Sequence, residues 1–295
     1  MKDQITKKFA ATDGFNLTYR SWNAAKANRI VVCIHGIGDY SGWFRNIAPE
    51  LATDGNQVYA LDLRGFGESQ EEGLPLCRVS DFERHLQDID DFIIYLRNHH
   101  KGKRLYVFGH SLGGIYSIWY AANFSNAVDG LVLAAPAVVS AISNPKNRIK
   151  IFLANIFTPN KTHNPYVSPD AANRDPEEIK IMLEDPLETW QLTANYLSNV
   201  KKVLLKNVLK NASYIQSPTL ILQGQADTVI QPTGANLLYE KLNVTDKKLE
   251  VFSDAGHWFY DALSPAPPRE KFDTTKREQF VKILKEWLRN QQKTA

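Results

Sequence analysis

Residues 104–124 read RLYVFGHSLGGIYSIWYAANF, and this stretch decides the fold. An apolar run typical of a buried strand (104–109) leads into GHSLG (109–113), and a helical pattern then continues to Phe124. Glycines two residues either side of Ser111 let the strand and the helix approach closely. The start of the helix offers free N–H groups and the positive end of a dipole to a developing oxyanion. This context predicts that Ser111 is a nucleophile; the alternative is a small residue in a Gly-rich turn.

Short apolar runs alternate with amphipathic stretches along the rest of the chain. Strands are predicted at 14–22, 29–36, 57–65, 104–109, 128–136, 218–224 and 248–256. Helices are predicted at 43–53, 81–100 (with Ser80 as N-cap), 111–124, 233–242 and 274–292. Strands that alternate with helices imply a parallel sheet with both faces covered. The sequence therefore predicts an α/β fold with a mostly parallel central sheet.

The alternation stops after the strand at 128–136. The next strand begins about 80 residues later, far beyond what a parallel crossover needs. Prolines and helical patterns fill this gap, and five of its apolar residues require burial: Ile151, Phe152, Leu153, Ile156 and Phe157. We therefore predict an α/β core in two parts, 1–139 and 213–295, with a helical cap inserted at 140–212.

Bulk composition excludes several classes of protein. The chain has 295 residues, 43% of them hydrophobic and 23% charged, with a net charge of +3. This charge is too small to indicate a nucleic-acid partner. Cys33 lies in an apolar run and Cys77 in a predicted loop, a pattern that indicates neither a disulfide framework nor a metal site. The first residues lack the apolar core of a secretory signal, and no apolar run reaches the roughly 18 residues of a membrane span. We therefore predict a cytoplasmic protein that could be peripheral to a membrane; the alternative is a chain from which a signal peptide has been removed.

A serine nucleophile needs a base, and the seven histidines differ in their sequence context. His257 follows the last predicted strand in SDAGHWFY, at the sheet edge where Ser111 is expected. It is the predicted general base, and a surface-loop histidine is the alternative. The other six have other expected places: His35 and His110 in turn motifs, His163 in the cap, and His85, His99 and His100 on the solvated side of a helix.

The acid that orients the base is predicted at Asp227, in the turn QADTVI after the strand at 218–224. Asp254 and Asp261 flank His257 closely in sequence and are weaker candidates, because the orienting acid normally comes from another loop. The alternative role for Asp227 is a turn cap.

Two backbone N–H groups are predicted to bind an oxyanion. The strand at 29–36 ends in HGIGDYSGWF (35–44), whose glycines let the Ile37 N–H face Ser111. Leu112 N–H, at the start of the helix after Ser111, is the expected second donor. The alternative is a Gly-rich turn without this role.

Taken together, these motifs resemble the α/β-hydrolase superfamily and, within it, the monoacylglycerol lipase and lysophospholipase-like group. The resembling segments cover nearly the whole chain: DGFNLTYRSW, HGIGDYSGWF, ALDLRGFGES, GHSLGG, RDPEEIKIMLEDPL, SPTLILQGQADTVI and DAGHWFY. The resemblance implies a serine hydrolase that cleaves carboxylic esters of lipid-like substrates, monoacylglycerol or lysophospholipid, through an acyl-enzyme. It assigns the nucleophile to Ser111, the acid to Asp227, the base to His257 and the oxyanion amides to Ile37 and Leu112, with no cofactor or metal.

Other functions remain open from the sequence. Ser111 argues against the dehalogenases and epoxide hydrolases of the superfamily, which carry an aspartate at this turn. A proline-iminopeptidase-like serine peptidase or an acyltransferase uses the same three residues. A non-catalytic binding relative is disfavoured because all three residues are present.

The predicted cap raises the question of membrane contact. Residues 190–209 carry Leu197, Leu204 and Val208 on one face with lysines nearby, so this helix could touch a lipid surface; the alternative is a helix packed on the core. Five aromatic residues flank the catalytic motifs and either line a substrate pocket or belong to the core: Trp43, Phe44, Trp258, Phe259 and Tyr260.

Overall fold

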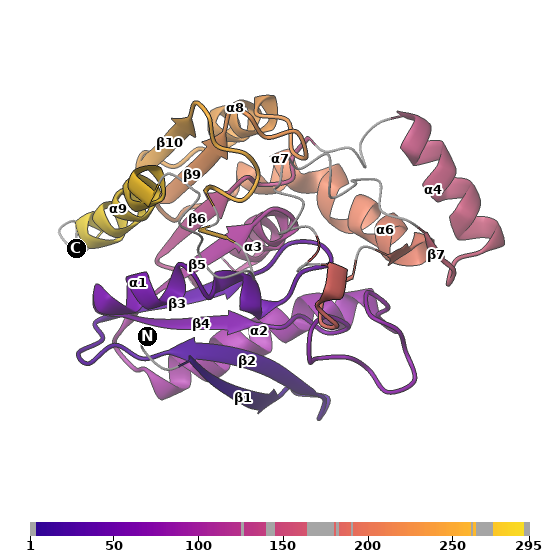
Figure 1. Cartoon of the computed structure of the whole chain (residues 1–295), viewed down its shortest axis with the longest axis horizontal. Helices are drawn as coiled ribbons and strands as arrows, with labels where there is room; N and C mark the ends of the chain where they lie inside the picture. The colour runs from indigo at the N-terminus through magenta and orange to yellow at the C-terminus, as the bar shows by residue number, and fades with distance from the viewer. Residues whose placement is uncertain are drawn as a thin grey trace.

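The fold is built on one large, mostly parallel sheet (Figure 1). The computed structural model describes residues 4–124, 127–139, 145–163, 180, 183–189, 191–260, 262–263 and 274–291. The strands are β1 (Gln4–Ala10), β2 (Asn16–Trp22), β3 (Arg29–Ile34), β4 (Asn56–Leu61), β5 (Arg104–His110), β6 (Gly130–Ala134), β9 (Thr219–Gly224) and β10 (Lys247–Phe252). Their order is β1-β2-β4-β3-β5-β6-β9-β10. β2 pairs antiparallel with both β1 and β4, and every other neighbouring pair is parallel. The predicted fold class is confirmed.

Alternate residues of each central strand belong to two separate cores. In β3, Ile30, Val32 and Ile34 pack with α2 (Phe82–His99), α3 (Leu112–Asn123) and α8 (Thr233–Lys241). Val31 and Cys33 point to the opposite face, where α1 (Ala48–Thr53) and α9 (Thr274–Asn290) lie. This period of two is what a strand buried on both faces requires.

Three elements differ from their predicted form. The helix expected at 43–53 is a 3-10 turn, η1 (Ser41–Phe44), followed by the short α1. The N-cap of α2 is Asp81, whose side chain accepts the Glu83 N–H, and not Ser80. β1 was not predicted, because this edge strand is mostly exposed and lacks an apolar alternation.

The described part of residues 140–212 is largely helical. It contains α4 (Pro145–Phe157), α6 (Ala194–Asn199), η4 (Val200–Leu204), η5 (Leu205–Asn207) and α7 (Val208–Ala212), and β7 (Thr162–His163) pairs with β8 (Leu192–Thr193). The cap boundaries at 140 and 212 stay a prediction. No helix within the described ranges is long and apolar enough to cross a membrane.

Two predictions about this region can be compared with the burial of its side chains. Ile151 is buried as expected, but the expectation of burial is wrong for Phe152, Leu153, Ile156 and Phe157, which are 62%, 47%, 55% and 76% exposed. α4 extends away from the sheet and contacts α6 (Figure 1), and these four side chains stay exposed. Conversely, Leu197, Leu204 and Val208 are buried in the core beside α3, so the helix at 190–209 packs on the core and its apolar face is not available to a membrane.

Candidate active site

Ser111 occupies a strained turn between β5 and α3. Its backbone has φ 55° and ψ −118°, a conformation that costs a non-glycine residue on the order of 1–3 kcal/mol. The glycines around it are required by close packing. A Cβ on Gly113 would collide with the Ile34 carbonyl oxygen and lie 2.6 Å from that of His35, and one on Gly109 would collide with the Gly113 carbonyl oxygen. The Gly-x-Ser-x-Gly pattern therefore lets α3 start directly against the end of β3.

Asp227 and His257 form a buried hydrogen-bonded pair. Asp227 follows β9 and His257 follows β10. Because β9 and β10 are neighbouring parallel strands, both residues lie at the carboxyl ends of the strands. The His257 Nδ1 lies 2.8 Å from Asp227 Oδ2. The other carboxylate oxygen, Oδ1, accepts the N–H groups of Val229 and Ile230, each at 2.8 Å. Asp227 is thus fixed by its own turn while it orients the histidine ring, so the cap-like bonds and the orienting bond coexist.

His110 connects the His257 loop to the turn that carries Ser111. The His110 Nε2 lies 3.1 Å from the His257 carbonyl oxygen, so this nitrogen carries the hydrogen, and the two rings are 4.8 Å apart. Ser111 and His257 are 5% and 4% exposed. No hydrogen bond joins these two side chains among the described residues; such catalytic hydrogen bonds commonly tighten only when substrate is bound. The contact made by His110 was not foreseen, because only the fold brings position 110 to position 257.

The loop after β3 passes directly beside Ser111. A Cβ on Gly36 would lie 3.2 Å from the Ser111 Cβ, so the backbone at 36–37 adjoins the nucleophile position. Within the described residues, the N–H groups of Ile37 and Leu112 donate to no other residue, as expected of Leu112 at the first position of a helix. The two predicted oxyanion donors are therefore close to Ser111 and unoccupied by internal acceptors.

A buried ion pair anchors the same loop from the sheet side. The Arg20 Nη1 on β2 lies 3.2 Å from Asp62 Oδ1, and both side chains are nearly inaccessible to solvent. Asp62 also accepts the Ser41 N–H at 2.7 Å and the Glu68 N–H at 2.9 Å. The Arg20 guanidinium lies 5.0 Å from the centre of the Tyr40 ring. The partners are far apart in sequence, so no local pattern predicts this anchor.

The flanking aromatic residues divide between two environments. Phe44 and Phe259 belong to the core on the α1 and α9 side, with Tyr260 packed against it. Trp43 and Trp258 form a separate cluster with Tyr40, against which Leu187 and Val229 pack. The core alternative therefore holds for the first group, whereas the second group joins loops around the site.

Two histidines near the site are buried and uncharged. His35 Nδ1 donates to the Gly36 carbonyl oxygen at 2.8 Å while its Nε2 accepts the Leu63 N–H at 3.1 Å, and burial lowers the pKa of His35 to about 4. The prediction of a solvated His85 is wrong: the side chain is fully buried against Phe82 and Tyr116, and this burial lowers its pKa to about 3. The side chain of His163 and the whole of Asp261 lie outside the described residues.

No group of three or more His, Cys, Asp or Glu side chains that could hold a metal is found in the described ranges. Cys33 and Cys77 are both free and buried.

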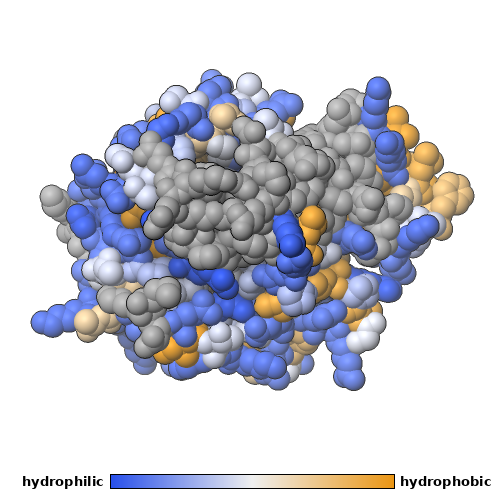
Figure 2. Space-filling model, viewed as in Figure 1, coloured by the Kyte–Doolittle hydropathy of each residue, from blue (hydrophilic) through white to orange (hydrophobic). Residues whose placement is uncertain are grey.

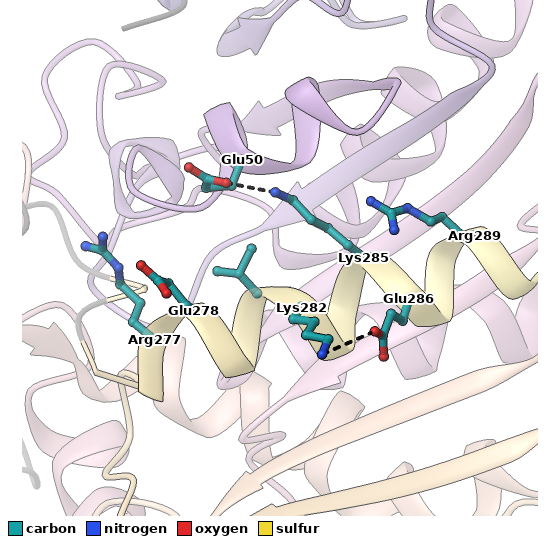
Figure 3. A pocket seen from close by; sticks show the side chains of 8 residues that line it. Glu50, Arg277, Glu278, Lys282, Lys285, Glu286 and Arg289 are labelled. Atoms are coloured by element: carbon teal, nitrogen blue, oxygen red, sulfur yellow. Dashed lines mark hydrogen bonds and ion pairs between the residues drawn. The ribbon is translucent and has the colours of Figure 1, made fainter. Parts of the chain in front are cut away.

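A surface groove between α1 and α9 is lined by charged side chains that pair with one another. Lys285 Nζ lies 2.8 Å from Glu50 Oε2, and Lys282 Nζ lies 3.9 Å from Glu286 Oε1 (Figure 3). The groove lies on the α1 and α9 side of the sheet and includes none of the predicted catalytic residues. Because its lining is mostly charged, this groove does not fit an apolar acyl chain.

Comparison with known proteins shows the family to which the chain belongs. The family described as "Serine aminopeptidase, S33" matches residues 25–260. Human monoglyceride lipase is 29% identical over 266 residues, covering 85% of this chain and 82% of the relative, and the monoacylglycerol lipase of Mycolicibacterium smegmatis is 26% identical, covering 84% and 88%. The crystal structure of Paleococcus ferrophilus monoacylglycerol lipase superposes with a TM-score of 0.76 at 26% identity, covering 93% of this chain and 99% of that one. The chain therefore belongs to the serine aminopeptidase S33 family and, among the α/β-hydrolases, to the monoacylglycerol lipase-like group of carboxylic ester hydrolases.

Proposed function

We propose that this protein is a serine hydrolase that cleaves carboxylic esters of lipid-like substrates through an acyl-enzyme on Ser111. The observation that carries the proposal is the buried Asp227–His257 pair, whose Nδ1–Oδ2 distance is 2.8 Å, at the sheet edge where Ser111 is held in its strained turn. Asp227 accepts the Nδ1 hydrogen, which leaves Nε2 of His257 free to take a proton.

In the proposed reaction, Ser111 Oγ attacks the ester carbonyl carbon while His257 Nε2 takes the hydroxyl proton. The N–H groups of Ile37 and Leu112 bind the negatively charged oxygen of the tetrahedral intermediate. His257 returns the proton to the departing alcohol, and Asp227 stabilises the positively charged ring meanwhile. Water activated by His257 then releases the acid from Ser111. Each oxyanion donor is expected to contribute on the order of 2.7–4 kcal/mol to transition-state stabilisation.

The nucleophile is tested by Ser111→Ala. The variant is expected to lose hydrolysis of p-nitrophenyl butyrate by at least about 1,000-fold, because a small residual rate comes from binding and the oxyanion donors alone. A fluorophosphonate probe should label the wild type at Ser111 and leave the variant unlabelled, while both proteins unfold at the same temperature. Full activity in a folded Ser111→Ala protein would disprove the proposal.

Within this reaction we propose monoacylglycerols or lysophospholipids as substrates; the names of the human and mycobacterial relatives support the first of these two classes. A series of glycerol and glycerophosphocholine monoesters over increasing acyl lengths tests this. The kcat/KM is expected to exceed that for short acetyl esters, and to differ between the two alcohol groups.

The name of the matching family favours a second candidate, hydrolysis of aminoacyl amides by the same three residues. Rates on an aminoacyl arylamide and on a monoacylglycerol, measured side by side, separate the two. A higher kcat/KM for the arylamide would assign a peptidase.

We further propose that α4 contacts a lipid surface that contains anionic headgroups. Ile149, Phe152, Leu153, Ile156 and Phe157 recur at the spacing of one helix face and are all exposed. Apolar side chains gather over α4 at one end of the molecule (Figure 2). The sequence of α4, PKNRIKIFLANIF, contains basic residues and no acidic ones, and exposed Lys146 and Lys150 offer charge complementarity to acidic lipid.

Vesicle co-sedimentation tests this contact. The double variant Phe152→Ser, Phe157→Ser should lower the fraction bound to vesicles with 30% phosphatidylglycerol by about fivefold or more, because it removes buried apolar area at the interface. Its melting temperature should not fall, since both side chains are exposed. A matched Lys202→Ser, Lys206→Ser variant on the core-packed helix should bind like the wild type. Equal binding of all three proteins would refute the proposal.

A further inference from the structure

Residues 185–189 of the predicted cap lie directly on the loop that carries Ile37. The Thr189 N–H donates to the Gly38 carbonyl oxygen at 3.0 Å. The Tyr40 hydroxyl donates to Asp185 Oδ2 at 2.8 Å. The segment therefore holds the loop at two points, one through backbone and one through side chains.

Gly38 shows how close this approach is. Its φ is +82°, and a Cβ at this position would collide with the Thr189 carbonyl oxygen. Glycine is thus required both by the backbone conformation and by the contact with the segment. Gly38 is the residue immediately after Ile37, so any displacement of this contact acts on the neighbouring peptide.

An apolar cluster links the same segment to the other catalytic loops. Leu187 packs against Tyr40, Trp43 and Trp258. Trp258 is the neighbour of His257, and Val229, which packs on the same cluster, donates its N–H to Asp227. One small cluster therefore contacts the loops of the proposed oxyanion donor, base and acid.

Tyr40 is the central residue of this arrangement. It is only 2% exposed, with the Arg20 guanidinium 5.0 Å from its ring centre and its hydroxyl bonded to Asp185. Burial and the Asp185 carboxylate raise the pKa of Tyr40, so the hydroxyl stays a hydrogen-bond donor. The buried Arg20–Asp62 pair fixes the next residue, Ser41, on the sheet side.

We propose that Tyr40 and Asp185 are positioning residues, which hold the Ile37 N–H at the distance from Ser111 that the oxyanion requires, so that residues 185–189 help to form the oxyanion hole. The inference rests on the proposed function. An oxyanion donor acts only within about 2.7–3.1 Å of the charged oxygen, and a misplacement of about 1 Å can cost on the order of 100-fold in rate. A bond from the segment to the loop therefore affects kcat without touching substrate.

The test compares Tyr40→Phe, Asp185→Asn and the double variant with Tyr120→Phe. Tyr120 is a matched control, because it is a buried tyrosine that donates to Asp90 at 2.9 Å near the opposite end of α3 from Ser111. On p-nitrophenyl butyrate, Tyr40→Phe and Asp185→Asn should each lower kcat about tenfold with KM within about twofold. The double variant should be no worse than either single variant, because both remove one interaction.

A transition-state analogue distinguishes positioning from a loss of stability. The inhibition constant of a trifluoromethyl ketone, whose adduct with Ser111 places an oxyanion in the hole, should rise by the same factor as kcat/KM falls. Tyr120→Phe should lower the melting temperature without changing kcat or this constant. The inference is overturned if Tyr40→Phe keeps kcat within twofold, if the single losses add in the double variant, or if the inhibition constant does not move.

Failure of the proposed function would look different. In that case the wild type itself would not hydrolyse the ester, or the fluorophosphonate would not label Ser111. If the wild type is active and labelled while the Tyr40 and Asp185 variants behave like Tyr120→Phe, only the positioning role is wrong.

Discussion

Asp227 illustrates how one side chain serves structure and proposed chemistry together. Its Oδ1 caps the turn through Val229 and Ile230, and its Oδ2 faces His257. Residues whose motifs are contiguous, such as Ser111 in GHSLG, can be predicted from sequence because strand, turn and helix follow one another in the chain. Tyr40 and Asp62 could not be, because their roles depend on partners more than twenty residues away that only the fold brings near.

The proposed role of Asp227 gives a prediction at the scale of one residue. Asp227→Asn keeps the size of the side chain but removes the charge that stabilises a protonated His257, and an amide can hold the ring in the wrong tautomer. The kcat on p-nitrophenyl butyrate is expected to fall on the order of 1,000- to 10,000-fold. The proper comparison is Asp254→Asn, since Asp254 also precedes His257 but is bonded to Tyr260 and Lys276 at the surface; its activity should stay within twofold. A larger loss in Asp254→Asn would transfer the role of the acid to that residue.

At the scale of elements, the accuracy of the sequence prediction follows burial. β3 and β5 are buried on both faces and were predicted within two residues of their observed ends. The exposed edge strand β1 was missed, and the helix expected at 43–53 divides at Arg45–Ile47. α4 shows the opposite error, because an apolar face predicts burial only where another surface covers it. Here the described structure leaves that face open, and we propose a lipid surface in its place.

At the scale of the whole molecule, the proposed catalytic residues lie on loops at the carboxyl ends of the central strands. The parallel strands β3, β5, β9 and β10 deliver Ile37, Ser111, Asp227 and His257 to that edge, as expected for the carboxyl ends of strands in an open α/β sheet. The sequence predicted that these loops lie together because strands alternating with helices run parallel, so that their carboxyl ends lie on the same side of the sheet. The buried state of His85 was not predictable, since Tyr116 and Tyr196 enclose it from α3 and α6.

Two buried histidines should make the free energy of unfolding depend on pH. Burial lowers the pKa of His35 to about 4 and that of His85 to about 3, whereas both are near 6.5 in the unfolded chain. Between these values the unfolded state binds more protons than the folded state, so stability is lost as pH falls below about 6.5. At 1.36 kcal/mol per pH unit, each histidine should remove about 2 kcal/mol between pH 7 and pH 5.

Urea unfolding at pH 7 and pH 5 measures this loss. His85→Leu places an apolar side chain that cannot titrate in the cluster of Phe66, Phe82, Tyr116 and Tyr196. It should reduce the pH-dependent loss by about 2 kcal/mol, whatever its effect on stability at pH 7. His99 lies on the same helix but is exposed, so His99→Gln should keep the wild-type difference between the two pH values. If His85→Leu loses as much stability as the wild type between pH 7 and pH 5, His85 is not the buried neutral group that the fold describes. A reduced loss in His85→Leu alone would assign about 2 kcal/mol of the acid sensitivity to the contact between α2, α3 and α6, outside the three proposed catalytic residues.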